Sequence, residues 1–267
     1  MLSRSSQRPI RLASFARRAR QARKLTHLLS RRRFRHALLY RVAGAVEHRT
    51  VPFDPPFSTV IDVGAHTGQF ALFALDAFPS ARVLCFEPLA DAQHRLRKAT
   101  GSDPRVQLFG VAAGSATGEC TLHVTRSTDS SSLLPVSARL PTVFPLTEEV
   151  RRETVDVLPL DIALQGESLA RPCLLKIDVQ GSELDVLSGA DTALASTDQV
   201  LVECSFVELY LGQPLAGDVV CHLLERDFEF SGGYNPVYDR ERRPKRLVQA
   251  DLLFSRPQVS AVTSQTA

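Results

Sequence analysis

Residues 60–113 alternate short apolar runs with segments of helical periodicity. The apolar runs cover residues 60–63, 81–86 and 106–113, and the two stretches between them, 69–78 and 91–99, have the spacing of helices. Parallel strands are joined by crossover connections, usually helices, and these connections are right-handed. The order strand–helix–strand–helix–strand therefore predicts an α/β fold around a parallel sheet.

The regular pattern resumes after an irregular stretch between residues 114 and 160. We expect strands at 121–124 and 154–160 and a polar loop at 127–132, together forming an insertion over the edge of the sheet. Beyond it, the pattern predicts strands at 173–178 and 199–203 and helices at 183–195 and 216–226. Strands at 228–231 and 250–255 flank a segment rich in Gly, Pro and Arg, which predicts a C-terminal β-hairpin.

The basic charge of the chain is concentrated at its N-terminal end. Residues 1–50 hold 14 of the 32 Lys and Arg residues but only one of the 29 acids, Glu47. We predict a basic helical arm over residues 1–51, a main domain over 52–256 and a flexible tail over 257–267. The arm either caps the main domain with a solvated basic face or contacts an anionic surface, which would be a membrane or a nucleic acid.

The cysteines and the N-terminus bear on the compartment. Five cysteines without a Cys-x-x-Cys pair argue against a disulfide framework and a structural zinc site, and Cys85, Cys173 and Cys204 are expected to be buried thiols. We find no run of about 18 apolar residues and no signal-peptide core, so we expect a soluble, cytoplasmic protein, peripheral to a membrane at most. The Arg-rich start would also suit a mitochondrial transit peptide.

A glycine-containing loop, Asp62-Val-Gly64-Ala-His66-Thr-Gly68, separates the first strand from the first helix. Glycines let the backbone approach a ligand closely, and a helix N-terminus offers free N–H groups. A dinucleotide fingerprint needs glycine at its first, third and sixth positions, but His66 and Gln69 stand at the third and sixth. The loop therefore argues against an NAD-dependent oxidoreductase and fits the turn that holds the methionine end of S-adenosylmethionine (SAM).

Acidic side chains follow several of the expected strands. Glu87 lies at the end of the second strand, 19 residues after Gly68, where an acid can accept hydrogen bonds from both ribose hydroxyls of an adenosine. Ligands of open α/β sheets bind beyond the carboxyl ends of the strands. We therefore expect Asp62, Glu87 and Asp178 to line one crevice, although Asp178 and Glu183 could instead cap the following helix.

Several segments extend these observations in a fixed order, namely 60–70, 86–88, 130–133, 157–161, 176–183 with 187–189, and 201–203. On these segments, residues 59–256 resemble the FkbM family of SAM-dependent methyltransferases. The resemblance implies a Rossmann-like class I methyltransferase fold, with a mostly parallel seven-stranded sheet, an antiparallel C-terminal hairpin and the N-terminal helical arm in addition. It also implies O-methylation of a hydroxyl on a sugar, glycolipid or polyketide-type natural product, with SAM as the cofactor.

The resemblance and the loops together predict the site residues. The expected SAM-binding residues are Asp62, Gly64, His66, Gly68, Phe70, Glu87, Pro88, Ala112, Ser131 and Asp178. His66 stands where the family more often has asparagine, and it either orders the loop or serves as a base. Asp178 is the candidate general base, ahead of Glu203 and His123. We predict no metal site, the alternative being a divalent ion between Asp178 and Glu203.

The expected partner is a small-molecule or glycan acceptor with a free hydroxyl, in a pocket shaped by the 114–160 insertion. Ser131 and Ser132 are expected near SAM or the acceptor. A nucleic-acid methyltransferase is an alternative suggested by the basic arm, but such enzymes carry an Asn/Asp-Pro-Pro-aromatic motif where this chain has Asp178-Val-Gln-Gly. A non-catalytic SAM-fold binding module is a second alternative, although it would not need to keep Gly64, Gly68, Glu87 and Asp178.

Overall fold

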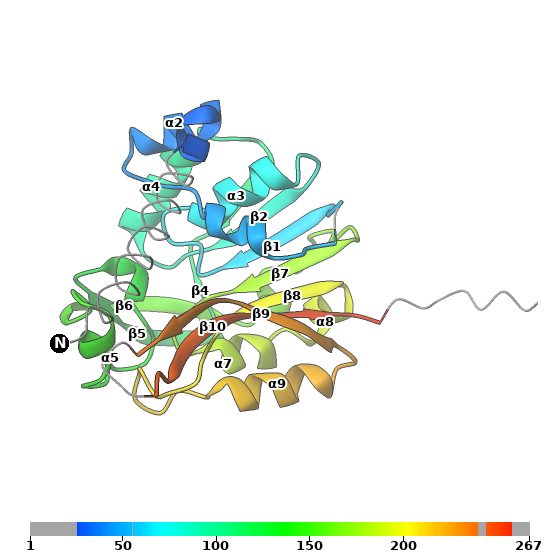
Figure 1. Cartoon of the computed structure of the whole chain (residues 1–267). Helices are drawn as coiled ribbons and strands as arrows, with labels where there is room; N and C mark the ends of the chain where they lie inside the picture. The colour runs from blue at the N-terminus through cyan, green and yellow to red at the C-terminus, as the bar shows by residue number, and fades with distance from the viewer. Residues whose placement is uncertain (1–25, 55, 240–243, 258–267) are drawn as a thin grey trace, which may run out of the picture.

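A seven-stranded sheet forms the centre of the computed structural model, which describes residues 26–54, 56–239 and 244–257 (Figure 1). Its strand order is β3-β2-β1-β7-β8-β10-β9; β10 pairs antiparallel with both β8 and β9, and all other pairs are parallel. This confirms the predicted Rossmann-like class I methyltransferase sheet with its C-terminal hairpin. The strands are β1 (Thr59–Val63), β2 (Arg82–Phe86), β3 (Val106–Phe109), β7 (Cys173–Ile177), β8 (Gln199–Ser205), β9 (Glu229–Tyr238) and β10 (Leu247–Ser255).

Helices cover both faces of this sheet because its buried strands are apolar on both sides. Val60 packs with α3 (Gln69–Ala77) and α4 (Ala90–Thr100), while Ile61, its neighbour, packs with helices on the opposite face. Those helices are α6 (Leu160–Ala163), α7 (Glu183–Ser188), α8 (Asp191–Ala195) and α9 (Ala216–Leu224). Cys85, Cys173 and Cys204 are buried free thiols, as predicted.

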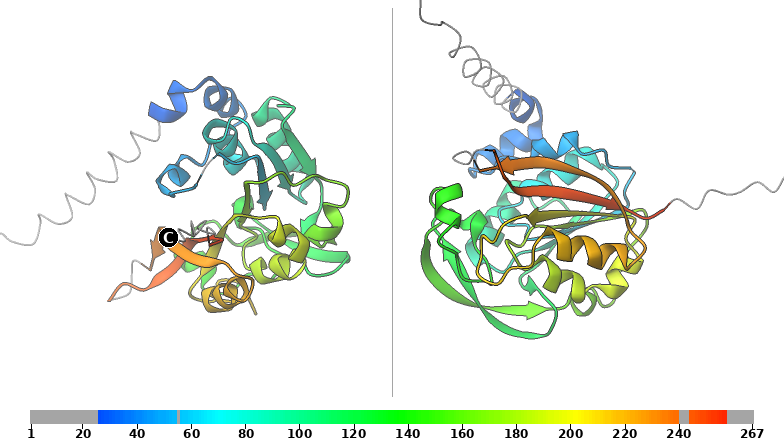
Figure 2. Two further views of the ribbon diagram at one scale, coloured as in Figure 1. Left: turned by 90° about the vertical axis from the view of Figure 1, so that its right-hand side faces the viewer. Right: turned by 60° about the horizontal axis from the view of Figure 1, so that its bottom comes forward.

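The expected third strand is divided between two sheets, which corrects the prediction of one strand over 106–113. The chain leaves the main sheet after Phe109 and joins a three-stranded sheet of order β4-β6-β5. This second sheet is the predicted insertion, and it lies apart from α2 in every view (Figure 2). Its elements are β4 (Ala112–Ala113), β5 (Gly118–Thr125) and β6 (Glu149–Leu158), with η2 (Thr128–Ser130) and α5 (Leu140–Val143) between β5 and β6.

The predicted helix over 183–195 is two helices, α7 and α8, separated at Gly189. A Cβ atom on Gly189 would lie 2.2 Å from the carbonyl oxygen of Gly114 and 3.1 Å from Pro159. The backbone at residue 189 therefore lies too close to Gly114 and Pro159 to leave room for a side chain.

Residues 26–51 pack against the main domain. Phe34 and Ala37 of α2 (Arg32–Leu38) are buried with Leu72 of α3 and Ala99 of α4. The 3₁₀ helix η1 (Val46–Thr50) then leads into the domain. The rest of the predicted arm and most of the tail lie outside the described residues, so the three-part division of the chain stays a prediction. Within the described part, no helix is long and apolar enough to cross a membrane.

Candidate active site

Two cavities meet at the carboxyl edge of the parallel strands. The larger has a volume of about 410 Å³ and reaches toward β9, β10 and η1, and the narrower lies toward β2 and the second sheet. The two cavities share five of their lining residues, which are Gly64, His66, Asp129, Asp178 and Gln180. The cavities therefore form one trough, and these five residues mark its junction.

Gly64 is required by the close contact of two loops. Its φ of +78° lies in the left-handed region, and a Cβ atom there would sit 1.8 Å from the carbonyl oxygen of Asp178. The turn after β1 thus lies directly against the end of β7. Gly68, with a φ of +92°, begins α3 and faces Leu96, and it lines neither cavity.

His66 connects the turn to both neighbouring walls. Its backbone N–H donates to Glu87 Oε2 at 2.8 Å, and its ring nitrogens lie 3.2 Å from Gln69 Nε2 and 2.9 Å from Thr128 Oγ1. Burial lowers the pKa of His66, which favours the neutral ring. The side chain therefore cross-links the loop to η2.

Glu87 presents a buried carboxylate to the narrower cavity. Its Oε2 accepts the N–H of His66, and its Oε1 accepts the N–H of Leu89 at 2.8 Å. Burial raises the pKa of Glu87 to about 7, although these two hydrogen bonds oppose the shift. Each oxygen keeps a further lone pair for a ligand hydroxyl. The surrounding wall includes Pro88, Leu89, Val111, Ala112, Ser131, Ser132 and Leu133.

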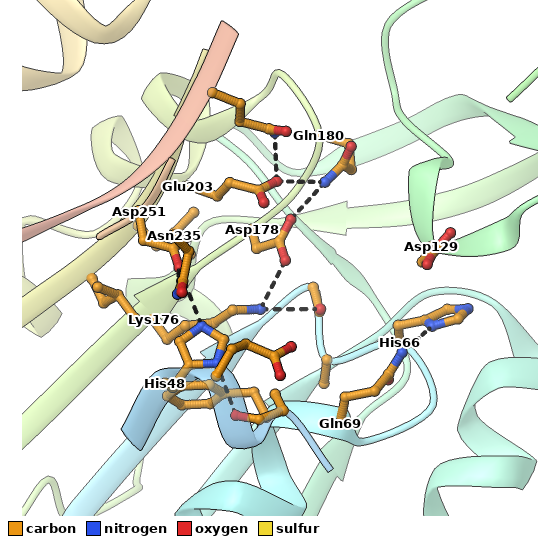
Figure 3. A pocket seen from close by; sticks show the side chains of 18 of the residues that line it. His48, His66, Gln69, Asp129, Lys176, Asp178, Gln180, Glu203, Asn235 and Asp251 are labelled. Atoms are coloured by element: carbon orange, nitrogen blue, oxygen red, sulfur yellow. Dashed lines mark hydrogen bonds and ion pairs between the residues drawn. The ribbon is translucent and has the colours of Figure 1, made fainter. Parts of the chain in front are cut away.

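Asp178, directly after β7, is held in its ionised form at the junction. Lys176 Nζ lies 3.4 Å from Asp178 Oδ2 (Figure 3). It also lies 3.3 Å from Asp62 Oδ1. Burial alone would raise the pKa of Asp178, but the Lys176 ammonium and a hydrogen bond from Gln180 Nε2, 2.7 Å long, lower it below its ordinary value. Asp178 is thus a carboxylate that faces both cavities.

Glu203 of β8 is a neutral neighbour of this carboxylate. Burial and repulsion from Asp178 and Asp251 raise the pKa of Glu203 well above its ordinary value. Its Oε2 accepts hydrogen bonds from Gln180 Nε2 at 2.8 Å and Gln249 Nε2 at 2.6 Å, which leaves Oε1 to carry the proton. Gln180 is fixed in turn, because its Oε1 accepts the Tyr210 hydroxyl at 2.8 Å.

The far wall of the larger cavity combines three elements. Asp251 of β10 lies opposite Glu203 in the sheet and accepts a 2.7 Å hydrogen bond from Asn235 of β9. His48 Nε2, from η1, lies 3.4 Å from the same Asp251 oxygen, Oδ2. Figure 3 shows Asn235 beside Asp251, with His48 next to them. The segment before the main domain therefore completes the cavity.

The structure brings together most, but not all, of the expected residues. Phe70 and Glu203 line the larger cavity. Asp62 corrects the expectation of three acids in one crevice, because it lies within β1, opposite Lys176, and is fully buried outside both cavities. His123 also lines neither cavity, since its ring pairs with Glu149 at 2.7 Å. No group of three or more His, Cys, Asp or Glu side chains in the described ranges is arranged to hold a metal ion.

Several residues of the site were not singled out from the sequence, among them Lys176, Gln180, His48, Asn235 and Asp251. Lys176 and Gln180 stand inside the Lys-Ile-Asp-Val-Gln-Gly motif, so their spacing around Asp178 could have identified them. His48 falls in the predicted arm, and Asn235 and Asp251 fall in the predicted hairpin. No local pattern marks these last three, because only the packing of η1 against the hairpin brings them to the cavity.

Several known proteins are similar to this chain. A family model described as the methyltransferase FkbM domain matches residues 62–230, more than half of the chain. The 2-O-methyltransferase NoeI of Sinorhizobium fredii is 30% identical over 173 residues, which cover 60% of this chain and 68% of NoeI. The AMB antimetabolite synthetase AmbE of Pseudomonas aeruginosa is 32% identical over 178 residues, or 56% of this chain, and the chain spans only 8% of AmbE. The crystal structure of methyltransferase FkbM from Methylobacillus flagellatus KT aligns with a TM-score of 0.49 and 18% identity, covering 77% of this chain and 46% of that one.

Proposed function

Because the chain belongs to the FkbM family of methyltransferases, with SAM as its cofactor, we propose that it methylates a hydroxyl oxygen of a sugar, glycolipid or polyketide-type natural product. The observation that carries the proposal is the ionised carboxylate of Asp178 at the junction of the two cavities. A base at that point reaches an acceptor in the larger cavity and a cofactor in the narrower one. The name of NoeI, a 2-O-methyltransferase, supports transfer to oxygen.

The narrower cavity has the chemistry to hold SAM. The Glu87 carboxylate has free lone pairs for the two ribose hydroxyls, and Leu89, Val111 and Leu133 supply apolar contacts for an adenine. The turn at Gly64 and the side chain of His66 then bound the methionine end, next to Asp178. When bound, SAM supplies an electrophilic methyl group on a sulfonium.

Asp178 removes the proton that the acceptor hydroxyl loses. A hydroxyl is a poor nucleophile, and a positioned base typically contributes about 10²–10⁴-fold to such a reaction. Lys176 keeps Asp178 ionised, and Gln180 fixes the orientation of Oδ1 through its 2.7 Å hydrogen bond. Glu203 is already protonated and does not compete for the proton.

The larger cavity fits an acceptor with several polar groups. Amide and carboxylate side chains line it from β8, β9 and β10, and Phe70 and Phe144 add apolar surface. A small number of fixed polar groups on a partly apolar wall is typical of a small-molecule site. Asn235, Gln249 and Asp251 are the groups that we assign to acceptor hydroxyls other than the one methylated.

The first test is a calorimetric titration with SAM, S-adenosylhomocysteine and NAD, followed by transfer of a radiolabelled methyl group to a panel of sugars, glycolipids and polyketide alcohols. We expect micromolar binding of the first two ligands and none of NAD. Asp178→Asn should lower methyl transfer about 10²–10⁴-fold and leave SAM binding within about twofold. The control Asp156→Asn changes an exposed acid of β6 outside both cavities and should alter neither. Failure to bind SAM would overturn the proposed function, and full turnover by Asp178→Asn would exclude Asp178 as the base.

A further inference from the structure

The outward side of α2 carries exposed cations next to an exposed leucine. Arg32, Arg35 and Leu39 are spaced by three and four residues, which places them on one side of the helix. The opposite side holds Phe34 and Ala37, which are buried against the domain. The exposed side is therefore fixed in its outward direction by the packing of the helix.

Neighbouring segments extend this surface. Arg35 Nη1 donates to the carbonyl oxygen of Leu29 at 2.9 Å, which places Leu29 beside it. At the other end, His36 Nε2 lies 3.0 Å from the carbonyl oxygen of Lys98, so the last turn of α4 joins α2. We use the term basic face for the five exposed residues Leu29, Arg32, Arg35, Leu39 and Lys98.

The cations of the basic face lack acidic partners. Among the described residues, no carboxylate lies within ion-pair distance of its two arginines or of Lys98, whereas nearby Arg33 pairs with Asp103 at 2.9 Å. Leu29 is 50% exposed and Leu39 is 76% exposed. The remainder of the chain, residues 51–267, holds more acids than bases. The basic face is thus a local patch of positive charge with apolar side chains inside it.

We propose that the basic face binds the surface of an anionic membrane, with Leu29 and Leu39 entering the interface between headgroups and acyl chains. Arginines and lysines near an anionic bilayer attract its headgroups, and apolar side chains on the same surface gain by leaving water. A nucleic-acid surface would use the same cations, but it offers nothing to an aliphatic side chain that is three-quarters exposed. The combination of both residue types therefore favours lipid. The inference does not depend on methyl transfer.

The test measures binding of the full chain to vesicles of phosphatidylcholine alone and of phosphatidylcholine mixed with phosphatidylserine, by co-sedimentation. We expect binding to the mixed vesicles only, weakening as salt is added. The double change Arg32→Glu and Arg35→Glu should lower the partition coefficient about 30-fold or more. The matched control Arg151→Glu and Arg152→Glu makes the same change in charge on exposed β6 and should bind almost as the unaltered protein does. Leu39→Ser should lower binding about fivefold with no change in charge.

SAM titration of every variant verifies the fold, since none of the altered residues lines either cavity. Four outcomes would overturn the proposal. Equal binding to both kinds of vesicle would remove the role of charge, and an equal loss in the two double variants would assign binding to net charge alone. Unaltered binding by the Arg32→Glu, Arg35→Glu protein would place the contact elsewhere in the chain. Salt-sensitive binding to duplex DNA without binding to mixed vesicles would replace lipid with nucleic acid.

Discussion

The binding of SAM should weaken sharply below pH 7 because of Glu87. Burial raises the pKa of this carboxyl to about 7, and ribose hydroxyls donate hydrogen bonds to its ionised form. If only the ionised form binds, the dissociation constant doubles at pH 7 and rises about tenfold by pH 6, relative to its value at pH 8. Calorimetric titrations with SAM at these three pH values measure this dependence.

Two variants locate the effect. Glu87→Gln should raise the dissociation constant at pH 8 by about 10- to 100-fold, because hydrogen bonds to a charged acceptor contribute about 1.5–3 kcal/mol, and it should abolish the pH dependence. Glu183→Gln is the matched control, since burial also raises the pKa of Glu183 to about 7 but its side chain lies outside both cavities. That variant should keep both the affinity and its pH dependence.

The unaltered protein keeps this test decisive even if Glu87→Gln folds poorly. The glutamine amide would face the N–H group of His66 or Leu89, which now donate to the carboxylate, so some loss of stability is expected. An affinity for SAM that stays constant between pH 6 and pH 8 in the unaltered protein would refute the assignment of Glu87 to the ribose. Loss of the pH dependence in Glu183→Gln would refute it equally.

Three further changes test the framework of the site, each by urea denaturation. Lys176→Met should lower the free energy of unfolding by about 3–5 kcal/mol, because it leaves Asp62 buried without its partner. Adding Asp62→Asn to this variant should restore part of the lost free energy. The absence of any recovery would contradict the pairing of Asp62 with Lys176. Gly64→Ala should lower the free energy of unfolding by about 3 kcal/mol, because Gly64 has a positive φ and lies against Asp178. The control Gly118→Ala, where nothing lies within 4 Å of the added Cβ atom, should lower it by less than about 1 kcal/mol. Equal losses in the two variants would refute the close approach of Gly64 to Asp178. Titration of Glu183 should lower the free energy of unfolding by about 3 kcal/mol as the pH rises from 4.5 to 7, because the raised pKa of Glu183 lets the folded state bind a proton that the unfolded state releases. If Glu183→Gln shows the same dependence of unfolding free energy on pH as the unaltered protein, the decline has another source.

The α/β class of the fold and the loops that line the narrower cavity could be predicted from the sequence because they depend on local patterns. Apolar runs that end at Gly64 and Glu87 place these residues at the carboxyl edge wherever the strands are parallel. Asp62 was wrongly expected in the crevice. Its side chain lies on a buried face of the sheet, where it forms an ion pair with Lys176 of the adjacent strand. Periodicity does not report such a cross-strand partner.

The larger cavity depends on contacts between segments far apart in the sequence. His48 reaches the cavity because α2 packs on α3 and α4, which turns η1 toward the hairpin. Asp251 is opposite Glu203 only in the antiparallel register of β10 and β8. Neither arrangement has a short motif, so a sequence analysis that ends the arm at residue 51 excludes His48 from the site.

The carboxyl groups of Asp178, Glu203 and Asp251 bear on the choice between the two candidate bases in the cavity. Glu203 lies opposite Asp251 in the sheet, and repulsion from Asp178 and Asp251 adds to burial in raising its pKa well above the ordinary value. Glu203 therefore holds a proton, whereas the Lys176 ammonium lowers the pKa of Asp178. A carboxyl group that already holds a proton at neutral pH cannot accept one from a hydroxyl. This argument supports our proposal of Asp178, rather than Glu203, as the base.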